Sequence, residues 1–238
     1  MPSQIVKLEA HASHLLDSFL SLRERYAMLH PMLFDVDVVR NHGTGIRARG
    51  FLTLRHSLFL SCAQDIAKLS LDRDERTPSI RRLVSSIGDL TLQAELRERF
   101  AVWILPNVEE EADPEIREAL RRIELREQNE RRMQFDEILT STNANAAALE
   151  ADPALKGFLT IRNKVSAHTE VHLVADKYQP VDISELGIKW SDLWRIIELM
   201  QELVEDIGLL IRNSGFAWES LDVQLSKASA QFWAPSAA

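Results

Sequence analysis

The order of apolar and polar positions along the chain is typical of helices. Apolar side chains recur every three or four residues, the spacing of one face of an α-helix, in segments 5–29, 45–71 and 191–212. We expect Pro31 to end the first helix, because proline disfavours the α conformation in the residue before it. Asn213 directly follows the third segment and is typical of a helix C-terminus. These segments predict long amphipathic helices.

Other helix starts are marked by a capping side chain followed by proline at the first helical position. This arrangement occurs three times, at Thr77–Pro78, Asp113–Pro114 and Asp152–Pro153. Gly88 is expected to close the short helix that follows the first of them. The sequence therefore predicts further helices between the long segments.

The helix predicted from Asp113 changes character along its length. Its first part has an apolar stripe made of Ile116, Ala119, Leu120 and Ile123. Its middle, residues 126–132, is polar all round, and Glu127 and Glu130 interrupt the arginines there. That mixture indicates a solvated section of a long helix rather than an RNA-binding stripe.

The remaining segments do not suggest a second fold class. Residues 171–187 contain β-branched side chains, Pro180 and Gly187, so we expect a loop with at most a short extended piece. The sequence has no series of alternating strands, no repeat of fixed period and no low-complexity linker. We therefore predict one all-α domain over residues 1–238, a helical bundle with a long amphipathic C-terminal helix.

Composition and charge restrict the cellular location and the kinds of partner that we expect for the protein. The 28 Lys and Arg residues against 36 Asp and Glu give a net charge of −8, so a nucleic-acid site would have to be locally basic. The single cysteine, Cys62, lies in an apolar stretch and suits a buried thiol in a reducing compartment. Residues 1–20 do not have the pattern of a signal peptide, and no run of 18 apolar residues occurs. A cytoplasmic protein without membrane association is expected.

Common cofactor and metal motifs are missing. The sequence contains no glycine-rich phosphate loop, no dinucleotide fingerprint, no paired cysteines and no nucleophile elbow. His11 and His14 lie three residues apart, but no carboxylate pattern completes a metal site. His168 and His172, with Glu170 between them, are a better metal candidate and define the hypothesis of a metal-dependent hydrolase. Our primary expectation remains that the protein holds no metal and no other cofactor.

The sequence RNKVSAH, residues 162–168, places polar groups inside an otherwise apolar helical segment. The guanidinium of Arg162 can bind a phosphate through two hydrogen bonds, and the imidazole of His168 can transfer a proton near neutral pH. Together they suffice for RNA cleavage without a metal: the imidazole removes the 2′-hydroxyl proton, that oxygen attacks the phosphorus, and the guanidinium stabilises the added charge. We therefore take Arg162, Asn163 and His168 as candidate catalytic residues, with Arg162 and Lys164 binding substrate.

Helix geometry adds a constraint on this motif. In an α-helix six residues turn through roughly 240° beyond a full turn, so Arg162 and His168 would not share a face. A cleft between two copies of the helix would bring one chain's arginine to the other's histidine, which predicts a homodimer. Lys156, Arg162 and Lys164 would make that cleft basic.

A purely structural interpretation of the same residues stays open. In it Arg162 forms a salt bridge, Asn163 caps or bonds the backbone, and His168 ends the helix against its negative pole. A related alternative is a non-catalytic module whose basic groove holds RNA, a nucleotide or a partner protein.

The segment LTIRNKVSAHTE, near the C-terminal third of the chain, resembles the motif of the HEPN superfamily (higher eukaryote and prokaryote nucleotide-binding), and is most similar to its abortive-infection, AbiU-like branch. The earlier segment LSCAQDIAKLSLDRDERTPSIRRLV, in which a helix runs into an Asp-containing loop and then a Ser-Ile helix, is also similar to that branch. The resemblance is clearest over residues 50–208.

The resemblance implies a helical bundle that dimerises and acts as a metal-independent endoribonuclease, in phage defence or in a toxin–antitoxin system. It assigns phosphate binding to Arg162, the polar orienting role to Asn163 and proton transfer to His168, with five residues between Arg162 and His168. Besides RNA and a second copy of the chain, it suggests an antitoxin or a nucleotidyl-modifying enzyme as partner. Some members of the superfamily keep the fold without nuclease activity and serve as binding modules.

Overall fold

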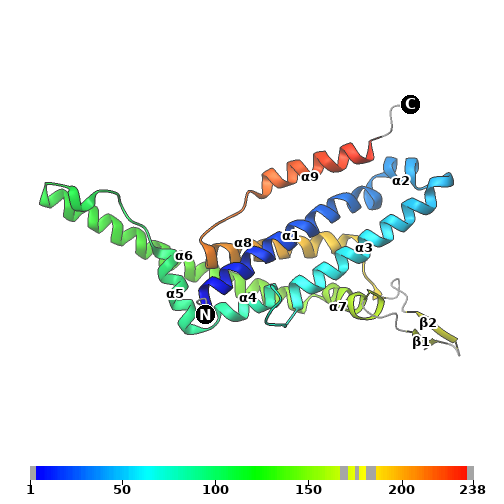
Figure 1. Cartoon of the computed structure of the whole chain (residues 1–238), viewed down its shortest axis with the longest axis horizontal. Coiled ribbons are helices and arrows are strands. Elements are labelled where there is room, and N and C mark those ends of the chain that lie inside the picture. Colours follow the sequence, from blue (N-terminus) through cyan, green and yellow to red (C-terminus); the bar gives the residue numbers. More distant parts are fainter. Residues whose placement is uncertain (1–3, 167–170, 175–176, 181–185, 235–238) are drawn as a thin grey trace.

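The computed structural model describes residues 4–166, 171–174, 177–180 and 186–234 and is built almost entirely of helices (Figure 1). The helices are α1 (Gln4–Phe34), α2 (Val36–His42), α3 (Ala48–Leu71), α4 (Ile80–Ile87), α5 (Leu90–Ala101), α6 (Pro114–Ala151), α7 (Pro153–Thr160), α8 (Trp190–Arg212) and α9 (Trp218–Trp233). Short 3-10 turns occupy Gly45–Arg47 and Val108–Glu110, and a π-helix occupies Ile161–Ser166. The predicted all-α bundle is confirmed.

One antiparallel hairpin is added to the helices. Strand β1 (Val171–Val174) pairs with β2 (Lys177–Pro180), with His172 opposite Gln179. The hairpin projects from the bundle near the end of α7 (Figure 1). The expected short extended piece is thus two paired strands.

The main core cluster lies where α1, α3 and α8 meet, and a smaller second cluster is formed by Met32, Val38, Phe51 and Trp233. Helix α1 packs against both α3 and α8, and α6 also packs against α8. The predicted apolar face of α8 is buried as a whole, and it consists of Leu193, Ile196, Ile197, Met200, Leu203, Val204, Ile207, Leu210 and Ile211. Asn213 ends this helix in the left-handed conformation, as predicted. Burial of an aliphatic side chain contributes about 1.5–3 kcal/mol, so the buried face of α8 stabilises the bundle substantially.

Helix α1 does not stop before Pro31, as the sequence suggested, but continues to Phe34. A proline inside a helix cannot donate to the carbonyl four residues earlier, which here belongs to Ala27. The hydroxyl of Ser229, on α9, donates to that carbonyl at 2.8 Å. The prediction was wrong because a helix far away in sequence supplies the missing hydrogen bond.

The two ends of α4 test predictions made from the local sequence. Helix α4 begins at Ile80 and is capped by Ser79, whose hydroxyl accepts from the Arg82 amide, so the predicted Thr77 cap is wrong. Gly88 closes α4 as predicted.

Helix α9 was not predicted from the sequence. It buries Trp233 but leaves the neighbouring Phe232 59% exposed.

The loop after α5 and the first half of α6 form an arm that extends from the bundle (Figure 1). Within α6, which the structure describes in full, buried side chains begin only at Phe135. The predicted apolar stripe therefore does not meet the core, since Ile116 and Ile123 are each 49% exposed.

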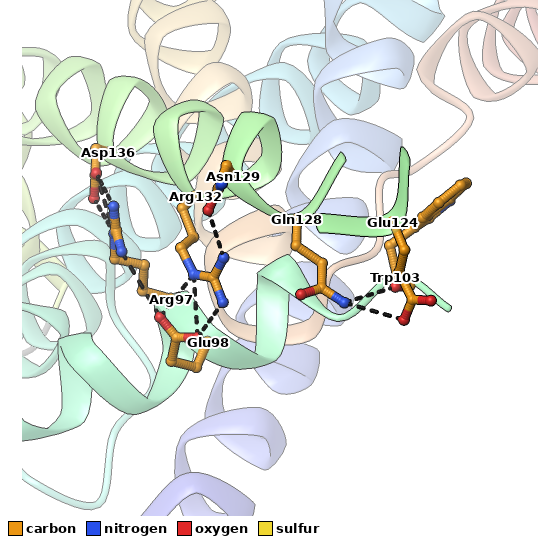
Figure 2. A network of polar contacts seen from close by, with 8 residues as sticks. All are labelled: Arg97, Glu98, Trp103, Glu124, Gln128, Asn129, Arg132 and Asp136. Carbon is orange, nitrogen blue, oxygen red and sulfur yellow. Dashed lines mark hydrogen bonds and ion pairs between the residues drawn. The ribbon is translucent and has the colours of Figure 1, made fainter. Parts of the chain in front are cut away.

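Polar contacts join α6 to α5 and to the loop after α5 at the base of this arm (Figure 2). The guanidinium of Arg97 lies 2.8 Å from the Asp136 carboxylate, and that of Arg132 lies 2.7 Å from the Glu98 carboxylate. The Gln128 amide donates to the Trp103 carbonyl at 3.0 Å. In the polar middle section Arg132 binds Glu98 and Arg126 binds Glu130, so two of its arginines pair with acids within the chain, in agreement with a solvated helix.

Candidate functional site

Helix α7 carries the start of the candidate site and is fixed at its first turn. Asp152 caps the helix by accepting from the Ala154 amide at 2.9 Å, as predicted. The same carboxylate is bound by the guanidinium of Arg195 on α8. Hydrogen bonds from Arg195 lower the pKa of Asp152. One aspartate therefore caps α7 and also attaches it to α8.

The middle of α7 lies very close to the chain that leads into α8. A Cβ atom on Gly157 would lie only 2.7 Å from the side chain of Ile188, so a larger residue here would require the Ile188 side chain to move. Phe158 and Ile161 are fully buried beside it. Packing thus fixes where α7 ends and where the motif begins.

The first five residues of the motif, 162–166, lie on a π-helix. From Ile161 to Ser166 the turn widens from α to π, with hydrogen bonds that span five residues instead of four. Such turns are rare and occur frequently at functional sites. This π-helix packs against α3.

The guanidinium of Arg162 is bound to an acid of the same chain. Its Nη2 atom lies 3.0 Å from Oδ2 of Asp72, the residue that ends α3. The Arg162 side chain remains 33% exposed, whereas that of Asp72 is 17% exposed. The contact engages one nitrogen of a planar group with five N–H donors, so a partly exposed edge of the arginine can still meet a phosphate.

The loop that carries Asp72 is ordered by its own polar contacts. The other carboxylate oxygen of Asp72 accepts from the Asp74 amide at 3.1 Å, and the Ser79 hydroxyl donates to the Asp72 carbonyl at 2.6 Å. Hydrogen bonds from Arg76 lower the pKa of Asp74 to about 2, which keeps this neighbouring carboxyl ionised. Asp72 is therefore held firmly where Arg162 meets it.

The other predicted site residues are placed as follows. Asn163 is exposed, Lys164 is partly buried and takes part in an interaction within the chain, and Lys156 is exposed on α7. His168 lies outside the described residues, so its distance from Arg162 is not part of the described geometry. The structure thus brings Arg162 to Asp72, a partner that sequence reasoning missed.

The π-helix alters one argument made from the sequence. The separation of Arg162 and His168 onto different faces assumed α-helical geometry throughout the motif. Residues 161–166 follow the wider π geometry, so the α-helical angle per residue does not apply to this part of the motif. His168 lies outside the described residues, and the homodimer stays a prediction.

The metal candidates from the sequence gain no support within the described residues. His11 and His14 share α1, and the pKa of His11 is lowered by burial, with Lys7 and Arg82 adding to the effect, so the surroundings disfavour a cation. His172 lies on strand β1, and the helical spacing that would pair it with His168 does not extend to it. His168 and Glu170 fall outside the described residues, among which no group of three potential metal ligands occurs.

The structure also bears on membrane association. Among the helices that the structure describes, none combines the length and the apolar character needed to cross a bilayer.

A signal for Asp72 exists in the sequence, although it was not assigned a role. Asp72 follows the last apolar residue of a long helix, in the Asp-containing loop that resembles the AbiU-like branch. Its pairing with a residue 90 positions away depends on how α3 packs against α7 and the π-helix, which periodicity does not reveal.

Comparison with known proteins gives one match. The family model described as AbiU2, of the HEPN superfamily, matches residues 5–232. Comparisons with curated proteins and with solved structures give no match. The match covers nearly the whole chain and includes α3, the Asp72 loop and the Arg162 motif. The chain therefore belongs to the AbiU2 family of the HEPN superfamily.

Proposed function

We propose that the protein is a metal-independent endoribonuclease that acts as a homodimer. The observation that carries this proposal is the placement of Arg162 on a π-helix, partly exposed and held by Asp72, within a motif that resembles that of HEPN ribonucleases. A guanidinium with a fixed orientation is what binding of a phosphate transition state requires.

In the proposed reaction His168 accepts the proton of a ribose 2′-hydroxyl, and that oxygen attacks the adjacent phosphorus. The bond from phosphorus to the 5′-oxygen breaks, and the leaving oxygen takes up a proton, which yields a 2′,3′-cyclic phosphate and a new 5′-hydroxyl. Arg162 stabilises the negative charge on the pentavalent phosphorus, Asn163 orients the reacting groups, and Lys164 assists in binding the RNA backbone. The requirement for a 2′-hydroxyl restricts the substrate to RNA.

One observation favours a second function, a module that binds RNA or a partner without cleaving it. Arg162 already has an internal acidic partner, which the purely structural interpretation of the motif anticipated. Such a module would bind RNA in a salt-dependent manner and release it unchanged.

Cleavage in the presence of a chelator separates these functions. Purified protein is incubated with a single-stranded RNA in EDTA, and the ends of the products are analysed. The nuclease proposal predicts 2′,3′-cyclic phosphate ends and complete loss of cleavage in His168→Ala, with an unchanged circular dichroism spectrum. RNA binding without products would establish the binding module, and activity that EDTA abolishes would restore the metal hypothesis.

The homodimer and the biological setting belong to the same proposal. A dimer would join two Arg162 motifs in one basic cleft, and sedimentation at several concentrations tests it. Family membership supports a role in abortive infection, with an antitoxin or a modifying enzyme controlling the nuclease in the cytoplasm.

A further inference from the structure

A large cavity lies beneath helix α9, on a part of the molecule that the Arg162 motif does not reach. It is open to solvent on one side, has a volume of about 950 Å³ and is lined by the second half of α1, by α2, by the first turns of α8 and by one face of α9. Figure 1 shows α9 lying along α1 and α2 at the C-terminal end of the chain. Small-molecule sites typically occupy roughly 300–1,000 Å³, so this cavity has the size of a ligand site.

Aromatic rings form much of its wall. Tyr26 and Trp194 stack with their ring centres 5.4 Å apart and their planes 19° from parallel. Phe34 and Trp233 line the cavity as well, and Phe34 is 47% exposed. These rings come from three different helices, so a ligand between them would be bound from several sides.

The cavity already contains one organic cation, the side chain of Arg23. Its guanidinium carbon lies 5.2 Å from the centre of the Trp194 ring, and the residue is only 4% exposed. Gln201 and Asp222 accept hydrogen bonds from its two terminal nitrogens. The wall around Trp194 is therefore able to hold a desolvated positive charge against an aromatic face.

The charge of the lining favours a second cation. The lining contains three carboxylates, those of Asp35, Asp37 and Asp222, and one guanidinium, that of Arg23, which gives it a formal charge of −2 when His30 is neutral. Burial lowers the pKa of His30, so this imidazole is neutral at physiological pH. An anion such as a nucleotide or an RNA backbone would be repelled.

The carboxylates of Asp35 and Asp37 differ in the partners that they already have within the chain. Asp35 caps α2 through the Asp37 and Val38 amides, whereas Asp37 pairs with Arg40 where both side chains are more than two-thirds exposed. Such an exposed pair contributes at most about 1 kcal/mol, and each carboxylate oxygen accepts more than one hydrogen bond. Asp37 therefore remains able to attract a ligand.

We propose that the cavity beneath α9 binds a small organic cation, an ammonium group carried on an aromatic or apolar body. The cationic group would lie against the exposed part of Trp194 and near the carboxylates, and the apolar body would fill the space toward Trp233. The site is independent of the proposed ribonuclease function, because none of its residues belongs to the Arg162 motif or to the Asp72 loop.

The test uses three benzyl compounds of similar size and different charge, titrated calorimetrically into the full-length protein. Benzyltrimethylammonium should bind at least about tenfold more tightly than benzyl alcohol, and benzylsulfonate should bind most weakly. Equal or tighter binding of the neutral or the anionic compound, or no binding of the cation, would overturn the proposal.

Matched tryptophan variants locate the site. Trp194→Leu should reduce the affinity for benzyltrimethylammonium about tenfold, whereas Trp190→Leu, on the same helix but packed on Phe59 outside the cavity, should leave it unchanged. Equal losses in both variants would refute the placement. If Trp194→Leu does not fold, Asp37→Asn at an exposed side chain provides the second test, with an expected loss of roughly two- to threefold for the cation and none for benzyl alcohol.

Discussion

The guanidinium of Arg162 and the carboxylate of Asp72 meet at 3.0 Å, although the two residues lie 90 positions apart in the sequence. The contact joins the π-helix that carries the motif to the loop between α3 and α4. It gives Arg162 one defined orientation before any substrate arrives, and that arrangement reduces the cost of organising a transition state.

The substitution Asp72→Asn tests this positioning. Asparagine keeps an oxygen for the Asp74 amide but loses the ion pair to Arg162, so RNA cleavage should fall about tenfold while stability changes by about 1 kcal/mol or less. Initial cleavage rates and urea unfolding of both proteins measure the two effects.

Two controls separate positioning from general damage to the loop. Asp74→Asn removes the neighbouring acid, which pairs with exposed Arg76, and should leave cleavage unchanged. In an Arg162→Ala background Asp72→Asn should have no further effect on residual cleavage, since Asp72 acts through Arg162. Additive losses in the double variant would contradict this role.

The hydrogen bond from Ser229 to the Ala27 carbonyl should be coupled energetically to Pro31. Ser229→Ala leaves a carbonyl without its donor and should lower the free energy of unfolding by about 1–2 kcal/mol. Pro31→Ala restores an N–H group to α1, so in that background the same serine substitution should cost about 1 kcal/mol less.

A double-mutant cycle by urea denaturation measures this coupling. Ser226→Ala, at an exposed position on the same face of α9, serves as the matched control and should be nearly neutral in both backgrounds. A coupling energy near zero would show that Ser229 does not compensate for the proline.

Cys62 should be unreactive in the folded protein. The residue is fully buried, and burial raises the pKa of its thiol to about 12, with nearby Asp65 adding to the effect. The reactive thiolate is therefore almost absent at pH 8. A chromogenic disulfide reagent should label Cys62 only after unfolding, and stoichiometric labelling of the native protein within minutes would disprove this.

Asp206 should destabilise the fold at neutral pH. Burial, with Glu202 and Glu205 nearby, raises the pKa of its carboxyl above 3.8, although the Thr142 hydroxyl donates to it at 3.2 Å. The folded state thus holds the proton more tightly than the unfolded state, and the associated stability is lost as the pH rises through the raised pKa.

Asp206→Asn should consequently raise the free energy of unfolding by about 0.5 kcal/mol at pH 7, an amount that allows for solvent screening at a half-buried group. The gain should shrink as the pH falls toward the ordinary value for aspartate. Thermal unfolding over this range measures it, with Glu198→Gln, at an exposed position on the same helix that does not act on the Asp206 carboxyl, for comparison. A gain that stays constant with pH would rule out titration as its cause.

The sequence predicted those elements whose determinants are local. The buried stripe of α8, its end at Asn213 and the aspartate–proline starts of α6 and α7 all depend on residues within a few turns. The motif, too, was found from the sequence as far as Arg162 and its neighbours. Helical periodicity and capping residues are sufficient to predict an element when contacts with distant segments only reinforce it.

The remaining features depend on contacts between distant segments. From the sequence alone Pro31 is expected to end α1, but Ser229 donates the hydrogen bond that the proline cannot give. Ser79 caps α4 in place of Thr77 because its hydroxyl also donates to the Asp72 carbonyl at the end of α3. The π-helix and the Arg162–Asp72 pair follow from how α7 packs against α3 and Ile188. Such tertiary effects cannot be derived from a local pattern.

The arm has a consequence for how evenly the molecule is stabilised. At 38 residues α6 is roughly 57 Å long, and its first half is held mainly by surface ion pairs such as Arg132–Glu98 rather than by buried side chains. Electrolyte weakens such pairs and leaves hydrophobic contacts largely intact. The backbone amides near Ile116 should therefore exchange with deuterium well before those of α8, and earlier still as ionic strength rises, so the arm can fray while the bundle stays folded.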